Sequence, residues 1–133
     1  MPEAPKPEVG SVGWVDLTVP DAAQVRDFYQ AVAGWKVHEV GMSDAGEKYA
    51  DYAMLTGGSG KGVTGICWRR GTNQDIPAGW MIYITVENLE ASIAKCLELG
   101  GKVVLGPRNF GPDAKYVFIQ DPSGACCGLF QAG

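Results

Sequence analysis

The stretch VPDAAQVRDFYQAVAGW, residues 19–35, contains the signals that begin and end one helix. Asp21 is a favourable N-cap residue directly after a proline, and Gln24 follows at the spacing of a capping box. Apolar residues then recur at helical spacing, at Val25, Phe28, Tyr29 and Val32. Gly34 stands where a helix commonly ends on a glycine. The stretch therefore predicts a helix between Asp21 and Gly34.

Strand patterns lie on both sides of this helix. Residues 11–19 read SVGWVDLTV, in which Val15, Leu17 and Val19 alternate with Trp14, Asp16 and Thr18. Three shorter strand-like segments follow the helix, at residues 36–40, 49–55 and 63–69. A strand, a helix and three further strands make one βαβββ unit.

The second half of the chain repeats this order. Residues 79–86 form an alternating strand, Asn88 is an N-cap candidate, and Gly100 closes the second predicted helix. The apolar stripe of that helix consists of Leu89, Ile93, Cys96 and Leu97. Later strands are predicted at residues 102–105, 116–120 and 126–131.

The two halves keep a common register. Asp21 matches Asn88 at an offset of 67 residues, and Gly65 matches Gly128 at an offset of 63. A register kept within a few residues indicates duplicated supersecondary units. Each unit alone is too small to bury its sheet, so we expect the two to pack together.

The composition is that of an ordinary globular chain, since 46% of its 133 residues are hydrophobic and 20% are charged. The net charge is −4 and the basic residues are scattered, so we expect neither nucleic acid nor a membrane as a partner. The four cysteines form no CxxC pair, and residues 1–10 have no apolar run that would suggest a secretory signal. Both features favour a cytoplasmic protein with free thiols.

The domain organisation follows from the repeat. We expect a flexible N-terminal segment at residues 1–9, rich in Pro, Glu and Lys, and a single domain at residues 10–133. Module one is predicted at about residues 10–70 and module two at about residues 78–131, joined by a polar linker.

The repeated motifs resemble those of the vicinal oxygen chelate superfamily, which includes glyoxalases, bleomycin-resistance proteins and extradiol dioxygenases. The residues that carry the resemblance are Val19-Pro20-Asp21, FYQAVAGW at residues 28–35, and the late turn Asp121-Pro122-Ser123-Gly124. The resemblance implies an α+β fold in which two tandem βαβββ modules form an open, curled mixed sheet with the helices outside. It also implies a ligand cleft between the modules and a homodimer.

The family's metal-dependent enzymes place His, Glu or Gln ligands at four strand positions. The resemblance maps these positions onto Trp14, Gly65, Met81 and Gly128. None of these side chains supplies a carboxylate oxygen or an imidazole nitrogen. We therefore expect a glyoxalase-like member that lacks the metal ligands and has no cofactor. A site with other ligands, such as Asp16, Asp51 or His38, stays open as an alternative.

The strand alternation places an aromatic and apolar set on the face where the family binds its ligands. The predicted ligand-binding residues are Trp14, Asp16, Thr18, Cys67, Met81, Tyr83, Cys126 and Phe130. Gly65 and Gly128 are expected to leave space for a ligand ring above the backbone. The alternative is that these side chains fill the core of a closed barrel.

Asp16 and Tyr83 are the candidate catalytic residues, because a carboxylate in an apolar cleft can serve as a general acid or base. The alternative is an aspartate paired with backbone or with a second copy of the chain. The predicted function is metal-free binding of an aromatic or apolar metabolite or drug. The alternative is a metal-dependent or acid/base lyase, isomerase or dioxygenase of the same superfamily.

Overall fold

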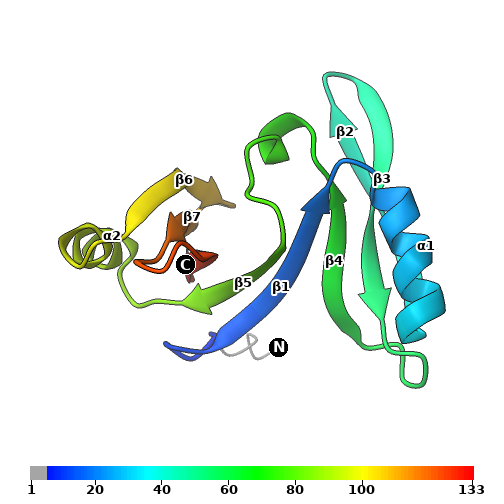
Figure 1. Ribbon diagram of the computed structural model, residues 1–133, viewed down its shortest axis with the longest axis horizontal. Coiled ribbons are helices and arrows are strands. Elements are labelled where there is room, and N and C mark those ends of the chain that lie inside the picture. Colours follow the sequence, from blue (N-terminus) through cyan, green and yellow to red (C-terminus); the bar gives the residue numbers. More distant parts are fainter. Residues whose placement is uncertain (1–5) are drawn as a thin grey trace. The chain divides into compact units, whose positions relative to one another are not determined.

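The computed structural model describes residues 6–133, and these residues form two compact units (Figure 1). The N-terminal unit is Val15–Trp80. The C-terminal unit is Met81–Gly133 together with the described residues up to Trp14. The predicted flexible segment at residues 1–9 lies partly outside the described residues.

The N-terminal unit has the predicted βαβββ order. Its elements are β1 (Val12–Val19), α1 (Ala22–Ala33), β2 (Lys36–Asp44), β3 (Glu47–Leu55), β4 (Gly62–Trp68) and a single 3-10 turn, η1 (Gly71–Asn73). The strands lie in the order β2-β3-β4-β1. β1 runs parallel to β4, and the other neighbours are antiparallel.

Helix α1 begins and ends where the sequence predicts. Asp21 Oδ1 accepts a hydrogen bond from the Gln24 amide at 3.1 Å, which satisfies one of the free N–H groups of the first turn. Gly34 has φ +73° and donates its N–H to Gln30 O at 3.2 Å. Ala22 is completely buried against Tyr52, Met54 and Ile66 of the sheet.

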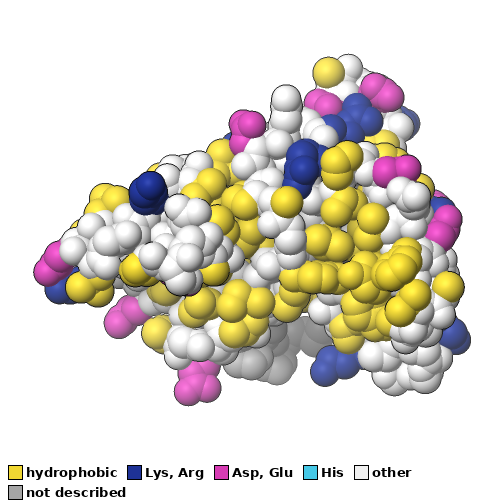
Figure 2. Space-filling model, in the orientation of Figure 1, with side chains coloured by type: hydrophobic (Ala, Val, Ile, Leu, Met, Phe, Trp, Pro, Cys, Tyr) yellow, Lys and Arg dark blue, Asp and Glu magenta, His cyan; other side chains and the backbone are white. Residues whose placement is uncertain are grey.

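The apolar stripe of α1 is only half buried. Val25 and Tyr29 pack against the sheet, whereas Phe28 is 54% exposed and Val32 is 68% exposed. Helix α1 packs against the sheet with the face that contains Ala22. The side chains of Phe28 and Val32 lie to one side of this helix–sheet contact. Figure 2 shows hydrophobic side chains gathered over this part of the N-terminal unit.

The β2–β3 hairpin is longer than predicted. Ala45 has φ +50° and Gly46 has φ +83°, which makes the tight two-residue connection favoured between twisted antiparallel strands. The prediction ended the first of these strands at residue 40, because Gly41, Ser43 and Asp44 are typical loop residues. In the structure these residues continue the ladder to the pair Asp44 and Glu47.

The C-terminal unit repeats the topology. Its elements are β5 (Trp80–Thr85), α2 (Leu89–Glu98), β6 (Lys102–Phe110), β7 (Ala114–Gln120) and β8 (Cys126–Gln131), with the strand order β5-β8-β7-β6. β5 is parallel to β8, as β1 is to β4. The segment just before β1 joins this unit, since Gly10 N donates to Thr85 O at 2.8 Å and Thr85 N donates to Ser11 O at 2.9 Å.

The core of the C-terminal unit lies between α2 and its sheet. Leu89 and Val117 are completely buried, and Leu129 is 7% exposed. Asn88 Oδ1 accepts from the Ala91 amide at 2.9 Å, so the predicted N-cap of α2 is confirmed. The end of the predicted stripe is not buried, because Leu97 is 56% exposed.

The predicted fold class is confirmed: the chain is mixed α+β, with two βαβββ repeats and one helix on one face of each unit's sheet. Within the described residues no helix has the length and apolar character needed to cross a membrane.

Candidate functional site

The sheet of each unit has one face covered by its helix and an opposite face, which we call the helix-free face. Cross-strand partners point to the same face of a sheet, and neighbours along a strand alternate. In the C-terminal unit, Ile84, Val117 and Leu129 pack on the α2 side. Their neighbours Tyr83 and Phe118, both paired with Gly128, therefore lie on the helix-free face.

Five rings on the C-terminal unit contact one another in sequence. We call them the aromatic row: Tyr83, Phe118, Tyr116, Phe110 and Phe130. Successive ring centroids are 5.7, 5.7, 6.5 and 6.1 Å apart, all in edge-to-face geometry, which is a favourable arrangement for aromatic pairs. Phe118 is 1% exposed, whereas Phe110 is 65% exposed. The row therefore contains one fully buried ring and one ring that is open to solvent.

Tyr83 lies directly over Gly128. A Cβ atom placed on Gly128 would be 2.6 Å from Cδ1 of the Tyr83 ring, far inside van der Waals contact. The expectation that Gly128 leaves space for a ligand ring is therefore wrong, because the chain's own tyrosine fills that space.

The N-terminal unit repeats this arrangement with different chemistry. Asp16 pairs with Gly65, and a Cβ atom on Gly65 would be 2.6 Å from Asp16 Oδ1. The expected space above Gly65 is likewise filled. Asp16 and Tyr83 thus occupy equivalent places in the two repeats, each over the glycine of the parallel strand beside it.

A polar cluster lies on the helix-free face of the N-terminal unit, around Asp51 and Cys67. Asp51 is 7% exposed, and its Oδ1 accepts from the Trp68 amide at 2.9 Å. Burial raises the pKa of Asp51, and the hydrogen bonds from Trp68 and Cys67 partly offset that rise.

Cys67 in this cluster is an unreactive thiol. Burial raises its pKa far above the ordinary range, and the negative charges of Asp16 and Asp51 raise it further. A nucleophilic cysteine needs the thiolate form. Cys67 therefore stays protonated and fits a packing or hydrogen-bonding role.

The predicted ligand-binding residues divide between the two units. Thr18 pairs with Cys67 next to Asp16 and Gly65 in the N-terminal unit. The C-terminal unit holds Trp14, Met81, Tyr83, Cys126 and Phe130. Tyr83 and Phe130 belong to the aromatic row, while Met81 is only 2% exposed. Cys126 lies on the helix-free face, opposite to Cys127, which packs on the α2 side.

Three members of the aromatic row were missed by the sequence analysis. Tyr116 and Phe118 alternate with Val117 and Ile119, so the period-2 pattern of β7 could have identified them. Phe110 could not be found in this way, because the prediction ended its strand at residue 105. The Gly-Pro pair at residues 106–107 interrupts the pattern there, although β6 continues to Phe110.

The four family metal positions do not fit a metal ion. Trp14, Gly65, Met81 and Gly128 lack oxygen and imidazole donors, and the spaces above both glycines are taken. The other candidate ligands, Asp16, Asp51 and His38, do not form a metal-binding group either, and none is found between residues 6 and 133. We therefore derive no step through a metal.

The curated proteins that resemble this chain include a putative glyoxylase and an anthracycline biosynthesis protein. It is 29% identical over 133 residues to the "Putative glyoxylase CFP32" of Mycobacterium bovis, covering 99% of this chain and 49% of that protein. It is 28% identical over 118 residues to the "Anthracycline biosynthesis protein DnrV" of Streptomyces peucetius, covering 87% of this chain and 39% of that protein. The chain thus spans half or less of the length of these relatives.

The fold is shared with a solved glyoxalase/bleomycin resistance protein/dioxygenase superfamily member from Vibrio splendidus 12B01. The TM-score is 0.56 at 16% identity, covering 90% of this chain and 97% of that chain. The model of the Glyoxalase/Bleomycin resistance protein/Dioxygenase superfamily matches residues 11–126. The predicted resemblance is confirmed, and the chain belongs to the glyoxalase/bleomycin resistance protein/dioxygenase superfamily.

Proposed function

We propose that this chain is a metal-free small-molecule-binding protein of the glyoxalase/bleomycin-resistance type, with the aromatic row as its main ligand-binding surface. The observation that carries the proposal is the series of edge-to-face ring contacts that includes the exposed Phe110. A flat apolar ligand gains both area burial and ring contacts on such a surface. The remaining predicted binding residues, Trp14, Asp16, Thr18, Cys67, Met81 and Cys126, belong to the same proposal.

The ligand class we propose is a polycyclic aromatic molecule. One relative is named for anthracycline biosynthesis, and anthracyclines are flat fused-ring molecules. The row offers several rings in succession, so a fused-ring ligand would contact more than one of them. Metal-free binding is supported by the missing donor atoms at Gly65 and Gly128.

The test is a fluorescence titration of the full chain with doxorubicin as the anthracycline probe. Phe110→Ala should weaken binding about 3- to 10-fold, since one aromatic contact contributes about 0.5–1.5 kcal/mol. Phe28→Ala is the matched control, because Phe28 is a similarly exposed phenylalanine that lies on α1, outside the row. Equal weakening by both variants, or none by Phe110→Ala, would contradict the proposal.

The metal-free part is tested separately by elemental analysis. Protein purified without chelator and then incubated with Zn, Mn, Ni or Fe should hold far less than one equivalent of any of them. A stoichiometric metal would overturn this part and leave the aromatic row to be tested on its own.

An acid/base enzyme is the second candidate function. It is favoured by the polar cluster of the N-terminal unit, where Asp16 and the buried Asp51 lie near Cys67. In this reading Asp16, with Tyr83 as a further candidate, moves a proton during a lyase or isomerase reaction. Asp16→Asn would then abolish turnover in lyase and isomerase assays.

We also propose a cytoplasmic homodimer. The cytoplasmic location is supported by four free cysteines, which suit a reducing compartment. The dimer rests on the family resemblance and is tested by light scattering across a dilution series. A mass of one chain at all concentrations would exclude it.

A further inference from the structure

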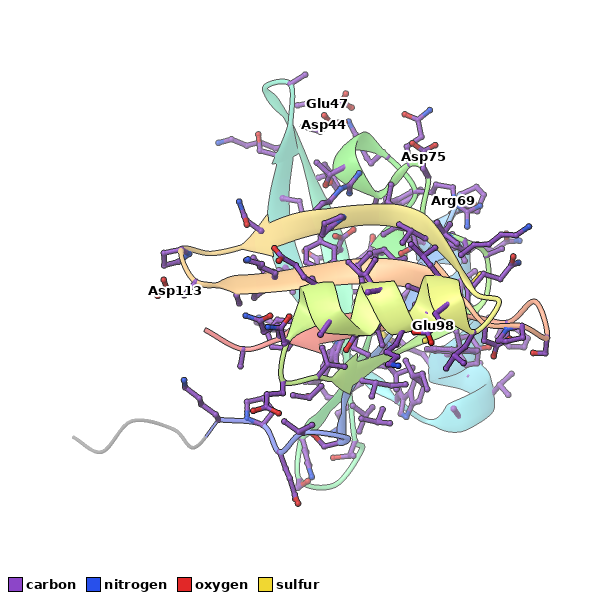
Figure 3. All side chains as sticks on the ribbon, turned by 90° about the vertical axis from the view of Figure 1, so that its left-hand side faces the viewer. Asp44, Glu47, Arg69, Asp75, Glu98 and Asp113 are labelled. Atoms are coloured by element: carbon purple, nitrogen blue, oxygen red, sulfur yellow. The ribbon has the colours of Figure 1, made fainter. Side chains whose placement is uncertain are left out.

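The N-terminal unit contains a pocket of about 700 Å³ beyond the ends of its two parallel strands. The lining residues come from the end of β1, the end of β4, the tip of β2 and the segment around η1: Pro20, Asp44, Trp68, Arg69, Arg70, Gly71, Gln74 and Asp75. Figure 3 labels Arg69 and Asp75 near η1, and Asp44 and Glu47 at the tip of the β2–β3 hairpin. The pocket therefore combines an apolar wall with charged groups of both signs.

The two arginines of this pocket differ in their partners. Arg70 Nε donates to Asp44 Oδ2 at 3.2 Å, and its Nη2 donates to Glu47 Oε2 at 3.2 Å. Its guanidinium also lies 4.3 Å from the centre of the Tyr49 ring. The charge of Arg70 is thus neutralised within the hairpin.

Arg69 has no such neutralisation. Its Nη2 donates to the Thr18 carbonyl at 2.9 Å, which fixes the guanidinium, but no carboxylate in the described part of the chain pairs with it. Its Nε is buried and has no hydrogen-bond partner. Arg69 thus presents to the pocket a positive charge that has no carboxylate partner, and a ligand oxyanion is the group that pairs best with such a charge.

From these contacts we propose that the pocket binds a small carboxylic acid, with the carboxylate on Arg69 and the apolar part of the ligand against Trp68 and Pro20. A guanidinium and a carboxylate form paired, charge-assisted hydrogen bonds. This site belongs to the N-terminal unit, whereas the aromatic row belongs to the C-terminal unit.

Asp75 sets the charge that the pocket accepts. Its carboxylate makes no hydrogen bond or ion pair within the described residues, and it lines the same pocket as Arg69. Asp75 reduces the net positive charge that Arg69 presents to a ligand, since both residues line the pocket. A doubly charged phosphate monoester costs more to remove from water than a singly charged carboxylate does, so the pocket prefers the carboxylate.

The experiment is a titration of the ¹⁵N-labelled full chain with sodium benzoate, followed by NMR at the Arg69 Nε–H and the Trp68 Nε1–H. Benzoate should shift both signals saturably, whereas the neutral isostere benzamide should not. Arg69→Met should weaken benzoate binding at least about tenfold, in line with the loss of a charged hydrogen-bonded pair. Asp75→Asn should strengthen benzoate binding about 2- to 5-fold by removing a repulsive charge.

The controls separate binding from folding and from the aromatic row. Arg26→Met removes an arginine that is paired with Asp27 outside the pocket, and it should leave benzoate binding unchanged. Arg69→Met should shift Tm by less than about 5 °C, because it removes an unpaired buried donor along with one hydrogen bond. Phe110→Ala should retain benzoate binding, so this proposal can fail or stand independently of the proposed function.

Four results would overturn the proposal. Benzamide could shift the same signals as strongly as benzoate, or Arg69→Met could bind benzoate like the parent chain. Phenyl phosphate could bind more tightly than benzoate, which would replace the carboxylate by a phosphate ligand. The absence of any saturable shift with benzoate would also exclude a carboxylate site.

Discussion

At the residue scale, Gly65 and Gly128 occupy equivalent strand positions but are covered by groups of unequal rigidity. The group over Gly128 is the flat Tyr83 ring, which also contacts Phe118. The group over Gly65 is the Asp16 carboxylate at the end of a short side chain. The same added methyl group therefore meets a packed ring in one unit and a polar tip in the other.

We predict that Gly128→Ala destabilises the chain by about 1–3 kcal/mol, because the Tyr83 ring must move out of its packed position. Gly65→Ala should cost clearly less, since the Asp16 carboxylate can rotate away. Urea denaturation of the two variants provides the comparison. Tyr83→Ala combined with Gly128→Ala should cost less than the two single changes added together, and strict additivity would contradict the contact.

Asp51 gives a pH-dependent prediction. Burial raises its folded-state pKa above the ordinary value of 3.8, so the folded state holds the proton more tightly than the unfolded state. The Asp51 contribution to stability is therefore present below about pH 3.8 and is lost as pH rises through the folded-state pKa.

Asp51→Asn should remove this loss while keeping an acceptor for the Trp68 amide. The difference in Tm between variant and parent should grow in favour of the variant from pH 3.5 to pH 7, when both are measured by differential scanning fluorimetry. Taking the difference cancels the opposite effect of carboxylates with lowered pKa, such as Asp121. A difference that is flat or falls with pH would show that Asp51 is not penalised by burial.

At the element scale, the helices depend on their polar caps because each buries only a narrow apolar stripe. Asp21→Ala should destabilise the chain by about 0.5–2 kcal/mol and lower Tm by about 3–6 °C. Asn88→Ala should have a similar effect through α2. Asp27→Ala is the control, since Asp27 lies inside α1 and, within residues 6–133, forms an ion pair only with its neighbour Arg26. An Asp27→Ala loss as large as that of Asp21→Ala would contradict the cap assignment.

At the same scale, some helix and strand boundaries could be predicted from the sequence and others could not. The helix boundaries were predictable because Asp21, Gln24 and Gly34 act locally. The hairpin strands were predicted too short because glycine and small polar residues in β2 are held in place by the partner strand. For the same reason the prediction missed Phe110, the exposed ring of the aromatic row.

At the scale of the whole molecule, the duplication made the fold predictable and the site only partly so. A repeated register needs no knowledge of side-chain positions, so the two βαβββ units followed from the spacing of Asp21 and Asn88. The Arg69 pocket depends on three-dimensional neighbours instead. The sequence alone does not distinguish Arg69 from Arg70. In the structure the charge of Arg70 is neutralised by Asp44 and Glu47, whereas that of Arg69 is not.

The tyrosine over Gly128 has an evolutionary consequence. A descendant of this protein that gained a glutamate at Gly128 would have no room for it while Tyr83 keeps its ring. Two changes, on two strands, would have to arise together before a metal ligand could return at this position. Each packed pair of this kind makes a change at one position depend on a change at the other. If the chain is metal-free as we propose, a metal ligand at Gly128 would therefore be harder to gain than by a single substitution.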